Sequence, residues 1–334
     1  MATISDVSRM AGVSKATVSR VINGTGQVKE STRLLVESVM KELNYKPSSV
    51  AQALATRSGN SIGLVLSDFT GSYFGLLLKQ ASESAEQMGK QLLIADGHNQ
   101  AESELHAVHS LVEKKCDVVI LYSRMLSEEQ VIALNQSIDV PLVNVGRRLP
   151  QSAGFSVSFD QQHAVAMAVE HLVLLGHQSI TYVGPAPKTP TSVSRLAGFQ
   201  SAIQSYALQK VSGNHVPCNF GFIEGYAAGK VLLNEGELPP AIVTASDDIA
   251  VGCIKAFAEQ GIVVPDDVSI VSIDNDPCSA FVTPSLTTVD LPIQAITERA
   301  MEVAQQLIQG QPIPPVEVIQ GSLVPRDSAK TISL

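Results

Sequence analysis

The stretch DVSRMAGVSKATVSRVIN, residues 6–23, determines how the first part of this chain folds. Residues 11–14 (AGVS) have the composition of a tight turn, in which Val13 is expected to tuck between the flanking elements. Ser14 is a good N-cap for a helix over residues 15–22, and Gly12 ends a preceding helix over residues 4–11. A third helix is predicted from residue 30 or 31 to about residue 43. The first 45 residues are therefore expected to form an all-α helix-turn-helix headpiece.

The exposed side of the second helix carries side chains that suit double-stranded DNA. Lys15 and Ala16 stand at its N-terminus, where a helix in the major groove meets base edges. Lysine pairs with guanine acceptors, and a small apolar side chain can touch a thymine methyl group. Arg20 is one turn further on and can also reach a base. Phosphate contacts, which fix register, are predicted for Thr17, Ser19 and Asn23.

The charge of the chain is unevenly distributed. The whole chain has a formal net charge of −9, which by itself argues against a nucleic-acid partner. Residues 1–59, however, hold eight Lys or Arg against four Asp or Glu, so that this part is +4 and the remainder is −13. A basic module on an acidic body directs polyanion binding to one end of the molecule.

From residue 62 the pattern changes to apolar runs that alternate with amphipathic stretches. This alternation predicts parallel sheets, with ligands bound beyond the carboxyl ends of the strands. About 270 residues exceed what one sheet usually needs, so we expect an α/β core of two similar lobes with a cleft between them. The predicted strands cover residues 62–66, 91–95, 118–122, 141–145, 155–159, 179–183, 241–244, 268–273, 286–289 and 316–319.

The sequence offers no constellation for catalysis, a cofactor or a metal. The four cysteines are far apart, without a C-x-x-C pair, and are expected to be free thiols in a reducing compartment. The histidines show no H-x-x-x-H spacing. Residues 59–63 match G-x-S-x-G, but a linker precedes Ser61 and a strand follows it, which is the reverse of what a nucleophile elbow requires. We expect a protein that is not an enzyme, lacks a membrane span and acts in the cytoplasm.

Polar residues at predicted strand ends and helix starts are candidates for ligand binding. Asp274 follows the apolar run 268–273, and Ser246 follows the run 241–245. Arg195 stands one turn into a helix that opens at Thr191. A carboxylate, a guanidinium and hydroxyls that converge on one cleft suit the vicinal hydroxyls of a sugar, whose apolar face could be covered by Phe74 and Phe220.

Asp274, Arg195 and Asp247, which follows Ser246, could also have structural roles instead of binding a ligand. Asp274 could be a helix N-cap before Pro277, and Arg195 could form a surface ion pair. Asp247 is interpreted as the N-cap of its helix rather than as a ligand residue.

The headpiece closely resembles that of the lac and galactose repressor family of bacterial transcription regulators. The likeness rests on residues 6–7 (DV), 11–14 (AGVS), 17–23 (TVSRVIN) and 43–47 (LNYKP). It continues through residues 191–198 (TSVSRLAG), 245–252 (ASDDIAVG), 268–270 (VSI) and 287–289 (TTV). The resemblance implies a periplasmic-binding-protein-like core and a homodimer on operator DNA. The sequence resembles the galactose and aryl-β-glucoside repressors more than it resembles the purine repressor.

The resemblance also implies functional residues. Residues 50–55 match a hinge helix that enters the minor groove, where Leu54 would wedge a base step next to Val50 and Ala51. Three implied effector positions, Gly146, Ser246 and Leu291, depart from the usual pattern of the family, and Arg147 is expected to fill part of the space beside Gly146. The other implied effector residues are Tyr73, Phe74, Thr191, Arg195, Phe220 and Asp274.

The expected organisation is therefore a headpiece over residues 1–46, a hinge and linker over 47–60, and a core over 61–334. One lobe is expected to take about residues 61–160 and 292–320, and the other about 161–290 and 321–334. The expected function is a regulator of repressor type, whose operator affinity is controlled by a small sugar-type effector. A sugar-binding receptor-like protein and a regulator that responds to a non-sugar ligand are the alternatives.

Overall fold

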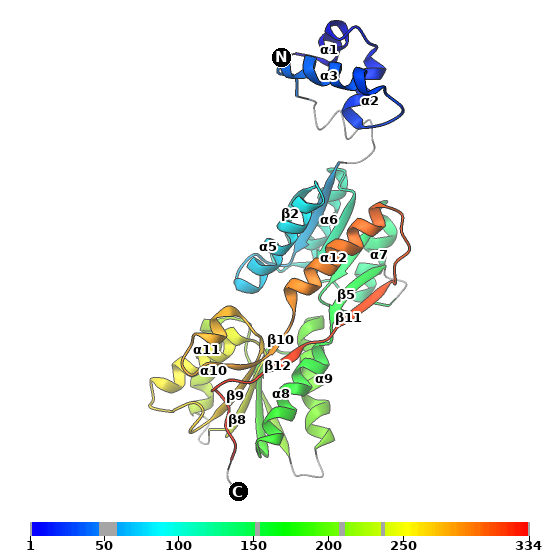
Figure 1. Ribbon diagram of the computed structural model, residues 1–334. Helices are drawn as coiled ribbons and strands as arrows, with labels where there is room; N and C mark the ends of the chain where they lie inside the picture. Colours follow the sequence, from blue (N-terminus) through cyan, green and yellow to red (C-terminus); the bar gives the residue numbers. More distant parts are fainter. Residues whose placement is uncertain (1, 47–58, 151–153, 207–210, 235–237, 333–334) are drawn as a thin grey trace.

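The computed structural model describes residues 2–46, 59–150, 154–206, 211–234 and 238–332 (Figure 1). Its N-terminal part consists of three helices, α1 (Ile4–Met10), α2 (Lys15–Asn23) and α3 (Glu30–Glu42). Here α2 ends one residue later than predicted, because Gly24 adopts the left-handed conformation (φ 64°) that closes the helix. The predicted helix-turn-helix is present.

Local hydrogen bonds and a small apolar core hold the headpiece together. The Ser14 hydroxyl accepts the Thr17 N–H at 3.1 Å, and Thr3 with Asp6 forms a capping box at the start of α1. Val7 and Val18 are fully buried against residues of α3, and Val13 in the turn packs against the same cluster, as predicted. The mini-core fixes α2 with its opposite side outward.

The rest of the described chain forms two six-stranded sheets. The first has the order β11-β5-β4-β3-β1-β2, with all of its pairs parallel. Its strands are β1 (Ser61–Leu66), β2 (Gln91–Asp96), β3 (Val118–Tyr122), β4 (Leu142–Val145), β5 (Phe155–Phe159) and β11 (Val316–Ile319). We call this sheet and its helices the first lobe.

The second sheet has the order β12-β10-β9-β8-β6-β7 and is parallel except for the β10–β12 pair. Its strands are β6 (Ser179–Gly184), β7 (Ser212–Pro217), β8 (Ala241–Thr244), β9 (Ser269–Asp274), β10 (Thr287–Asp290) and β12 (Ser322–Val324). We call this sheet and its helices the second lobe. Both edge strands, β7 and β12, were missed from the sequence, because neither has a run of apolar residues.

Helices cover both sheets, as the alternating pattern predicts. The first lobe carries α5 (Ser72–Gln87), α6 (Ala101–Glu113), α7 (Glu128–Ser137) and α12 (Ile293–Ile308). The second carries α8 (Gln161–Leu174), α9 (Pro190–Ser205), α10 (Phe222–Asn234) and α11 (Asp247–Ala258), and a 3-10 helix spans Pro277–Ala280.

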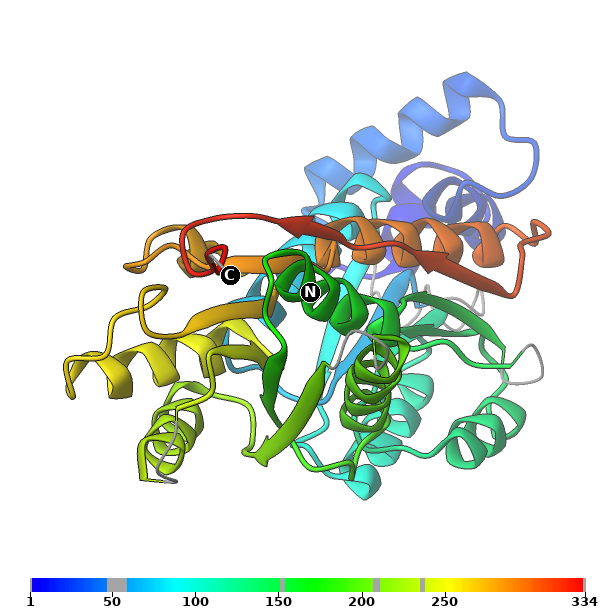
Figure 2. The same ribbon diagram turned by 90° about the horizontal axis from the view of Figure 1, so that it is seen from below.

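The chain passes between the lobes three times. It leaves the first lobe after β5 and returns from β10 to α12, which packs on α5 and on strands of the first sheet. Figures 1 and 2 show the third passage, an extended run from β11 to β12. Each passage is only a few residues long, so the two sheets are joined by three short connections at one level of the molecule.

Candidate DNA-reading helix and effector cleft

The outward side of α2 presents a basic surface. Lys15, Ala16 and Arg20 are exposed, as expected for residues that face a partner. The stem of Arg20 lies beside Gly26, where an added Cβ would be 3.4 Å from the Arg20 Cδ. Gly26 therefore leaves room for the Arg20 side chain to lie against the turn after α2.

The predicted phosphate-contacting residues are less exposed than the base-reading ones. Thr17, Ser19 and Asn23 are half-buried. Thr17 and Ser14 share a hydrogen bond between their hydroxyls at 2.9 Å, and Asn23 Nδ2 donates to the Ser19 Oγ at 3.2 Å. The hinge residues Val50, Ala51 and Leu54 lie outside the described residues, so their roles stay predictions.

Arg195 is the centre of the second-lobe side of the cleft. Its side chain is 5% exposed and donates from Nε to Gln161 Oε1 at 2.7 Å, from one terminal nitrogen to the Ala245 carbonyl, and from the other to Asp274 Oδ1 at 3.2 Å. Burial opposes the charge on Arg195, but Asp274 and nearby tyrosines outweigh it and raise the pKa of Arg195. Arg195 and Asp274 thus meet, as predicted, in an ion pair between a buried guanidinium and a half-buried carboxylate rather than a surface one.

The N-caps in this region differ from those predicted. Asp276, not Asp274, caps the 3-10 helix, and its carboxylate accepts the Cys278 N–H at 3.0 Å. The interpretation of Asp247 as an N-cap is wrong, because Ser246 holds that position and accepts the Ile249 N–H at 3.4 Å.

Asp247 is instead a buried hydrogen-bond acceptor inside the second lobe. Its carboxylate accepts from the hydroxyls of Ser272 and Thr288 and, at 2.7 Å, from the Asp276 N–H. Burial, together with the charge of Asp274, raises the pKa of Asp247 to about 7. Asp247 ties β9, β10 and the loop after β9 to the start of α11.

An aromatic cluster forms the first-lobe side of the cleft. Tyr73 and Phe74 of α5 meet Tyr122, the last residue of β3, with ring centroids 5.4–5.9 Å apart. The Tyr122 hydroxyl donates to that of Tyr73 at 3.3 Å, and burial raises the pKa of Tyr73. Phe74 is almost fully buried in this cluster.

The expectation that Arg147 fills the space beside Gly146 is wrong. A Cβ added at Gly146 would lie 2.6 Å from Cε2 of Tyr122, so the Tyr122 ring occupies that space. The guanidinium of Arg147 turns away and donates to the carbonyl of Leu126 at 2.6 Å. Burial lowers the pKa of Arg147.

The remaining predicted effector residues border the same region. Thr191 is half-buried in the first turn of α9, whose helix begins at Pro190 rather than at Thr191, because Thr189 is the N-cap. The half-buried Phe220 precedes α10, with its ring centroid 5.8 Å from Cζ of Arg195. Ser246 is buried and used as a cap, and Leu291 is buried after β10.

A cavity of about 590 Å³ lies between the lobes. Tyr73 and Gln80 of α5 line it from the first lobe, and Asp274 and Asp290 line it at the strand ends of the second. Leu291, in the passage that leads into α12, completes this side. Two of the predicted effector residues, Tyr73 and Asp274, therefore line one cavity together with Leu291.

Sequence reasoning missed Arg124 and the buried Glu104. Arg124 stands two residues beyond β3, so the strand-end rule that selected Asp274 would also have selected it. Glu104 is fully buried in α6, and its carboxylate accepts from the hydroxyls of Ser67 and Ser123. A glutamate in the first turn of an amphipathic helix gives no sign of such burial.

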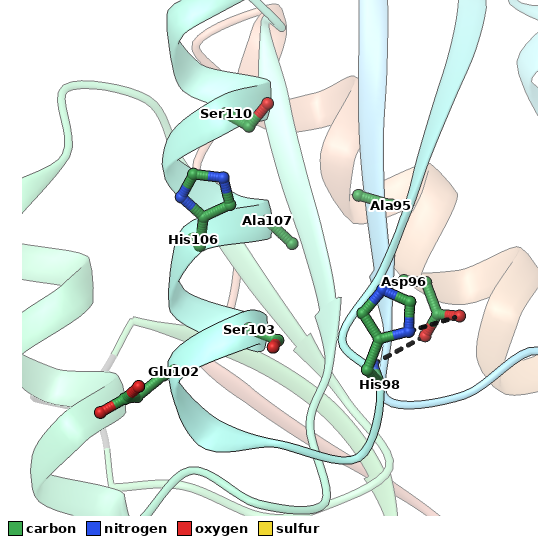
Figure 3. A pocket seen from close by; sticks show the side chains of 8 residues that line it. All are labelled: Ala95, Asp96, His98, Glu102, Ser103, His106, Ala107 and Ser110. Carbon is green, nitrogen blue, oxygen red and sulfur yellow. Dashed lines mark hydrogen bonds and ion pairs between the residues drawn. The ribbon is translucent and has the colours of Figure 1, made fainter.

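A second cavity, of about 410 Å³, lies away from the effector residues, between β2 and α6 (Figure 3). His98 turns back to Asp96, with 3.3 Å between Nδ1 and Oδ2, while His106 projects from α6. Across the ranges that the structure describes, no three His, Cys, Asp or Glu side chains are grouped as a metal would need.

Comparison with known proteins identifies the family. The model of bacterial regulatory proteins of the lacI family matches residues 3–48, and that of the periplasmic binding protein-like domain matches residues 169–329. The transcriptional regulator AscG of Escherichia coli K12 is 34% identical over 338 residues, covering 98% of both chains. The regulator GalR of the same strain is 32% identical, covering 100% of this chain and 97% of its own. The chain belongs to the lacI family.

Solved structures of family members have the same fold. The lac repressor dimer bound to operator and the anti-inducer ONPF matches with a TM-score of 0.88 and 29% identity, over 98% of this chain and 99% of that one. The complex of the regulator CelR with cellobiose matches with a TM-score of 0.71 and 25% identity, over 98% and 100%. The predicted resemblance and the predicted fold class, a helix-turn-helix headpiece with a two-lobed α/β core, are confirmed.

Family membership makes the chain a transcriptional regulator. The relatives named here are regulators rather than enzymes. No helix within the described segments is long and apolar enough to cross a membrane.

Proposed function

We propose that this protein is a repressor of a sugar-utilisation operon, whose affinity for operator DNA is set by a sugar-type effector bound between its lobes. The observation that carries the proposal is the position of Lys15, Ala16 and Arg20, exposed on one side of a helix whose other side is fixed in the headpiece. The lac repressor, a relative by fold, is solved on its operator.

On the DNA side, α2 lies in the major groove. Lys15, Ala16 and Arg20 read base edges, while Thr17, Ser19 and Asn23 contact phosphates. Val50, Ala51 and Leu54 belong to a hinge that enters the minor groove. This assignment divides the chain into a headpiece (1–46), a hinge and linker (47–60) and a core (61–334).

On the effector side, the cleft presents hydrogen-bonding groups and aromatic rings, the combination that sugars require. The effector contacts Tyr73, Phe74, Thr191, Arg195, Phe220, Ser246 and Asp274, with Gly146 at the border. A cellobiose complex among the related structures supports a sugar as the ligand class. The lobes divide at about residues 160, 291 and 320, so a ligand between them can change their angle.

The protein acts as a homodimer, in the cytoplasm and on the nucleoid. Two-fold symmetry matches a near-palindromic operator whose half-sites are about one helical turn apart. Large apolar side chains of the second lobe are available for the second copy: Phe281 is 86% exposed, Ile223 79% and Phe222 50%.

A gel-shift experiment tests the proposal. The purified protein selects its operator from random DNA, and the affinity is then measured with and without a panel of galactosides and β-glucosides. We expect at least one sugar to change the operator affinity. A protein that selects no sequence, or whose binding no sugar alters, would contradict the proposal.

Arg20→Ala tests the reading helix. Loss of a bidentate base contact costs about 1–3 kcal/mol of discrimination, so preference for operator over random DNA should fall at least about fivefold. Arg9→Ala is the matched control, because Arg9 on α1 is exposed and its ion pair within the described residues is with Asp6 at 3.0 Å. Unchanged preference in Arg20→Ala would remove α2 from base reading.

A further inference from the structure

Arg124 lies where the two lobes meet, and its main chain is held by a buried network. Its N–H donates to the Ser67 Oγ at 2.7 Å and to Glu104 Oε1 at 3.3 Å. Glu104 and Ser67 are fully buried, and Ser123 also donates to the Glu104 carboxylate. The position from which the Arg124 side chain starts is therefore fixed.

The guanidinium of Arg124 contacts aromatic rings from both lobes. Its Cζ is 4.7 Å from the ring centroid of Phe74 in the first lobe and 5.4 Å from that of Phe220 in the second. Stacking on rings uses the faces of the guanidinium plane and leaves the N–H groups at its edge for hydrogen bonds.

Arg195 and Arg124 differ in the hydrogen bonds that their guanidinium N–H groups make. Every nitrogen of the Arg195 guanidinium donates, to Gln161, Ala245 or Asp274. The guanidinium of Arg124, by contrast, makes no hydrogen bond and no ion pair with any residue that the structure describes. Each guanidinium nitrogen of Arg195 thus already has a protein partner, whereas the guanidinium donors of Arg124 have none among the described residues.

Among the residues that the structure describes, no carboxylate lies at ion-pair distance from Arg124, although its charge opposes the rise that burial causes in the pKa of Asp274. Asp274, one of four carboxylate residues that line the cavity with Asp276, Asp290 and Glu298, is paired with Arg195. Asp290, at the end of β10, accepts from Asn275 Nδ2 at 3.1 Å. An arginine with free donors and no paired carboxylate is suited to an anionic group, which its planar fork can bind through two parallel hydrogen bonds.

We propose that the effector is an acidic sugar, whose phosphate or carboxylate group is bound by the edge of Arg124 between Phe74 and Phe220. This inference rests on the proposed function, which already assigns the cleft to a sugar. The two rings lie 4.7 and 5.4 Å from the guanidinium carbon and limit its contact with water, which strengthens its charged hydrogen bonds. A ligand held there also contacts both lobes.

Calorimetry with the full chain tests the ligand class. The probes are glucose, galactose and cellobiose, the 6-phosphates of these sugars, glucuronate and galacturonate. We expect at least one acidic form to bind about tenfold more tightly than its neutral parent, as charge-assisted hydrogen bonds predict. The phosphate and uronate arms show which anionic group is used.

Variants of Arg124 connect the preference to this side chain. Arg124→Met keeps an unbranched stem without charge and should abolish the preference for the acidic form. Arg124→Lys keeps the charge but not the fork and should retain part of it. Lys114→Met is the control, because it removes an exposed positive charge of the first lobe at the end of α6; it should leave the preference intact.

Equal binding of acidic and neutral forms by the wild type would overturn the inference, as would a preference that survives in Arg124→Met. If neutral sugars alter operator binding and acidic forms do not, the proposed function stands and this inference falls. If no sugar of either kind binds or alters operator binding, the proposed function falls and the inference with it.

Discussion

The second lobe contains a buried polar group whose hydrogen-bonding capacity is not satisfied by any described residue, the hydroxyl of Tyr182. The hydroxyl of Tyr182 is fully buried and has no hydrogen-bond partner in the described part of the chain, while its ring stacks on Phe199 at 5.3 Å. Tyr182→Phe keeps the stacking and removes the unsatisfied group, so the free energy of unfolding should rise by about 1 kcal/mol in urea denaturation. Tyr226→Phe, which removes a hydroxyl that donates to Glu259 at 2.6 Å, should not raise it. A loss of stability in Tyr182→Phe would contradict this account.

Asp247 makes stability depend on pH in an unusual direction. Its pKa of about 7 in the folded chain lies above the ordinary 3.8, so between these values the folded state holds a proton that the unfolded state has released. Stability from this group is therefore present at low pH and is lost as pH rises toward 7. The free energy of unfolding of the wild type, relative to Asp247→Asn, should fall by on the order of 3 kcal/mol from pH 4 to pH 8. A difference that is constant with pH would be contrary to the assigned pKa.

Helices α10 and α11 approach so closely that only glycine fits between them. A Cβ at Gly252 would lie 2.3 Å from the Phe222 carbonyl oxygen and 2.4 Å from the Tyr226 nitrogen. Gly252→Ala must push the helices apart and should lower the free energy of unfolding by about 1–3 kcal/mol. Gly75→Ala is the matched control, because Gly75 in α5 has nothing within 4 Å of the added atom and should gain about 0.5–1 kcal/mol. Equal effects of the two changes would show that the packing is looser than described.

The elements that the sequence predicted correctly are those whose pattern is local. The caps of α2 and the apolar runs of β1, β3 and β8 are local signals, and both lobes follow from their alternation. Strand β7 was missed because its residues, SGNHVP, pack at the sheet edge and are mostly exposed. Asp247 was wrongly predicted to be the N-cap of α11. The N-cap is Ser246, one residue earlier, and a shift of one residue in the start of a helix leaves the apolar pattern of the sequence unchanged. Arg124 depends on rings 50 and 96 positions away in the chain, and no local pattern reports such contacts.

The charge of the molecule is divided between a basic N-terminal part, which favours DNA binding, and an acidic body, which opposes it. Residues 1–59 carry +4 and the remainder −13. Repulsion from the body acts over distances that salt screens, since the Debye length is about 8 Å at physiological ionic strength. The headpiece releases counterions from the DNA where its basic side chains touch phosphates. Screening over the Debye length does not remove this contribution to binding.

Counterion release should therefore dominate the salt dependence of operator binding. Each dimer brings two headpieces, and with about 6–10 phosphate contacts, raising salt from about 50 to 200 mM should weaken binding by about a thousandfold or more. Screening of the acidic body would act in the opposite direction and strengthen binding. Filter binding over this range distinguishes the two, because they predict slopes of opposite sign in log affinity against log salt concentration. A flat or rising slope would mean that the basic face of α2 makes no ionic contact with DNA.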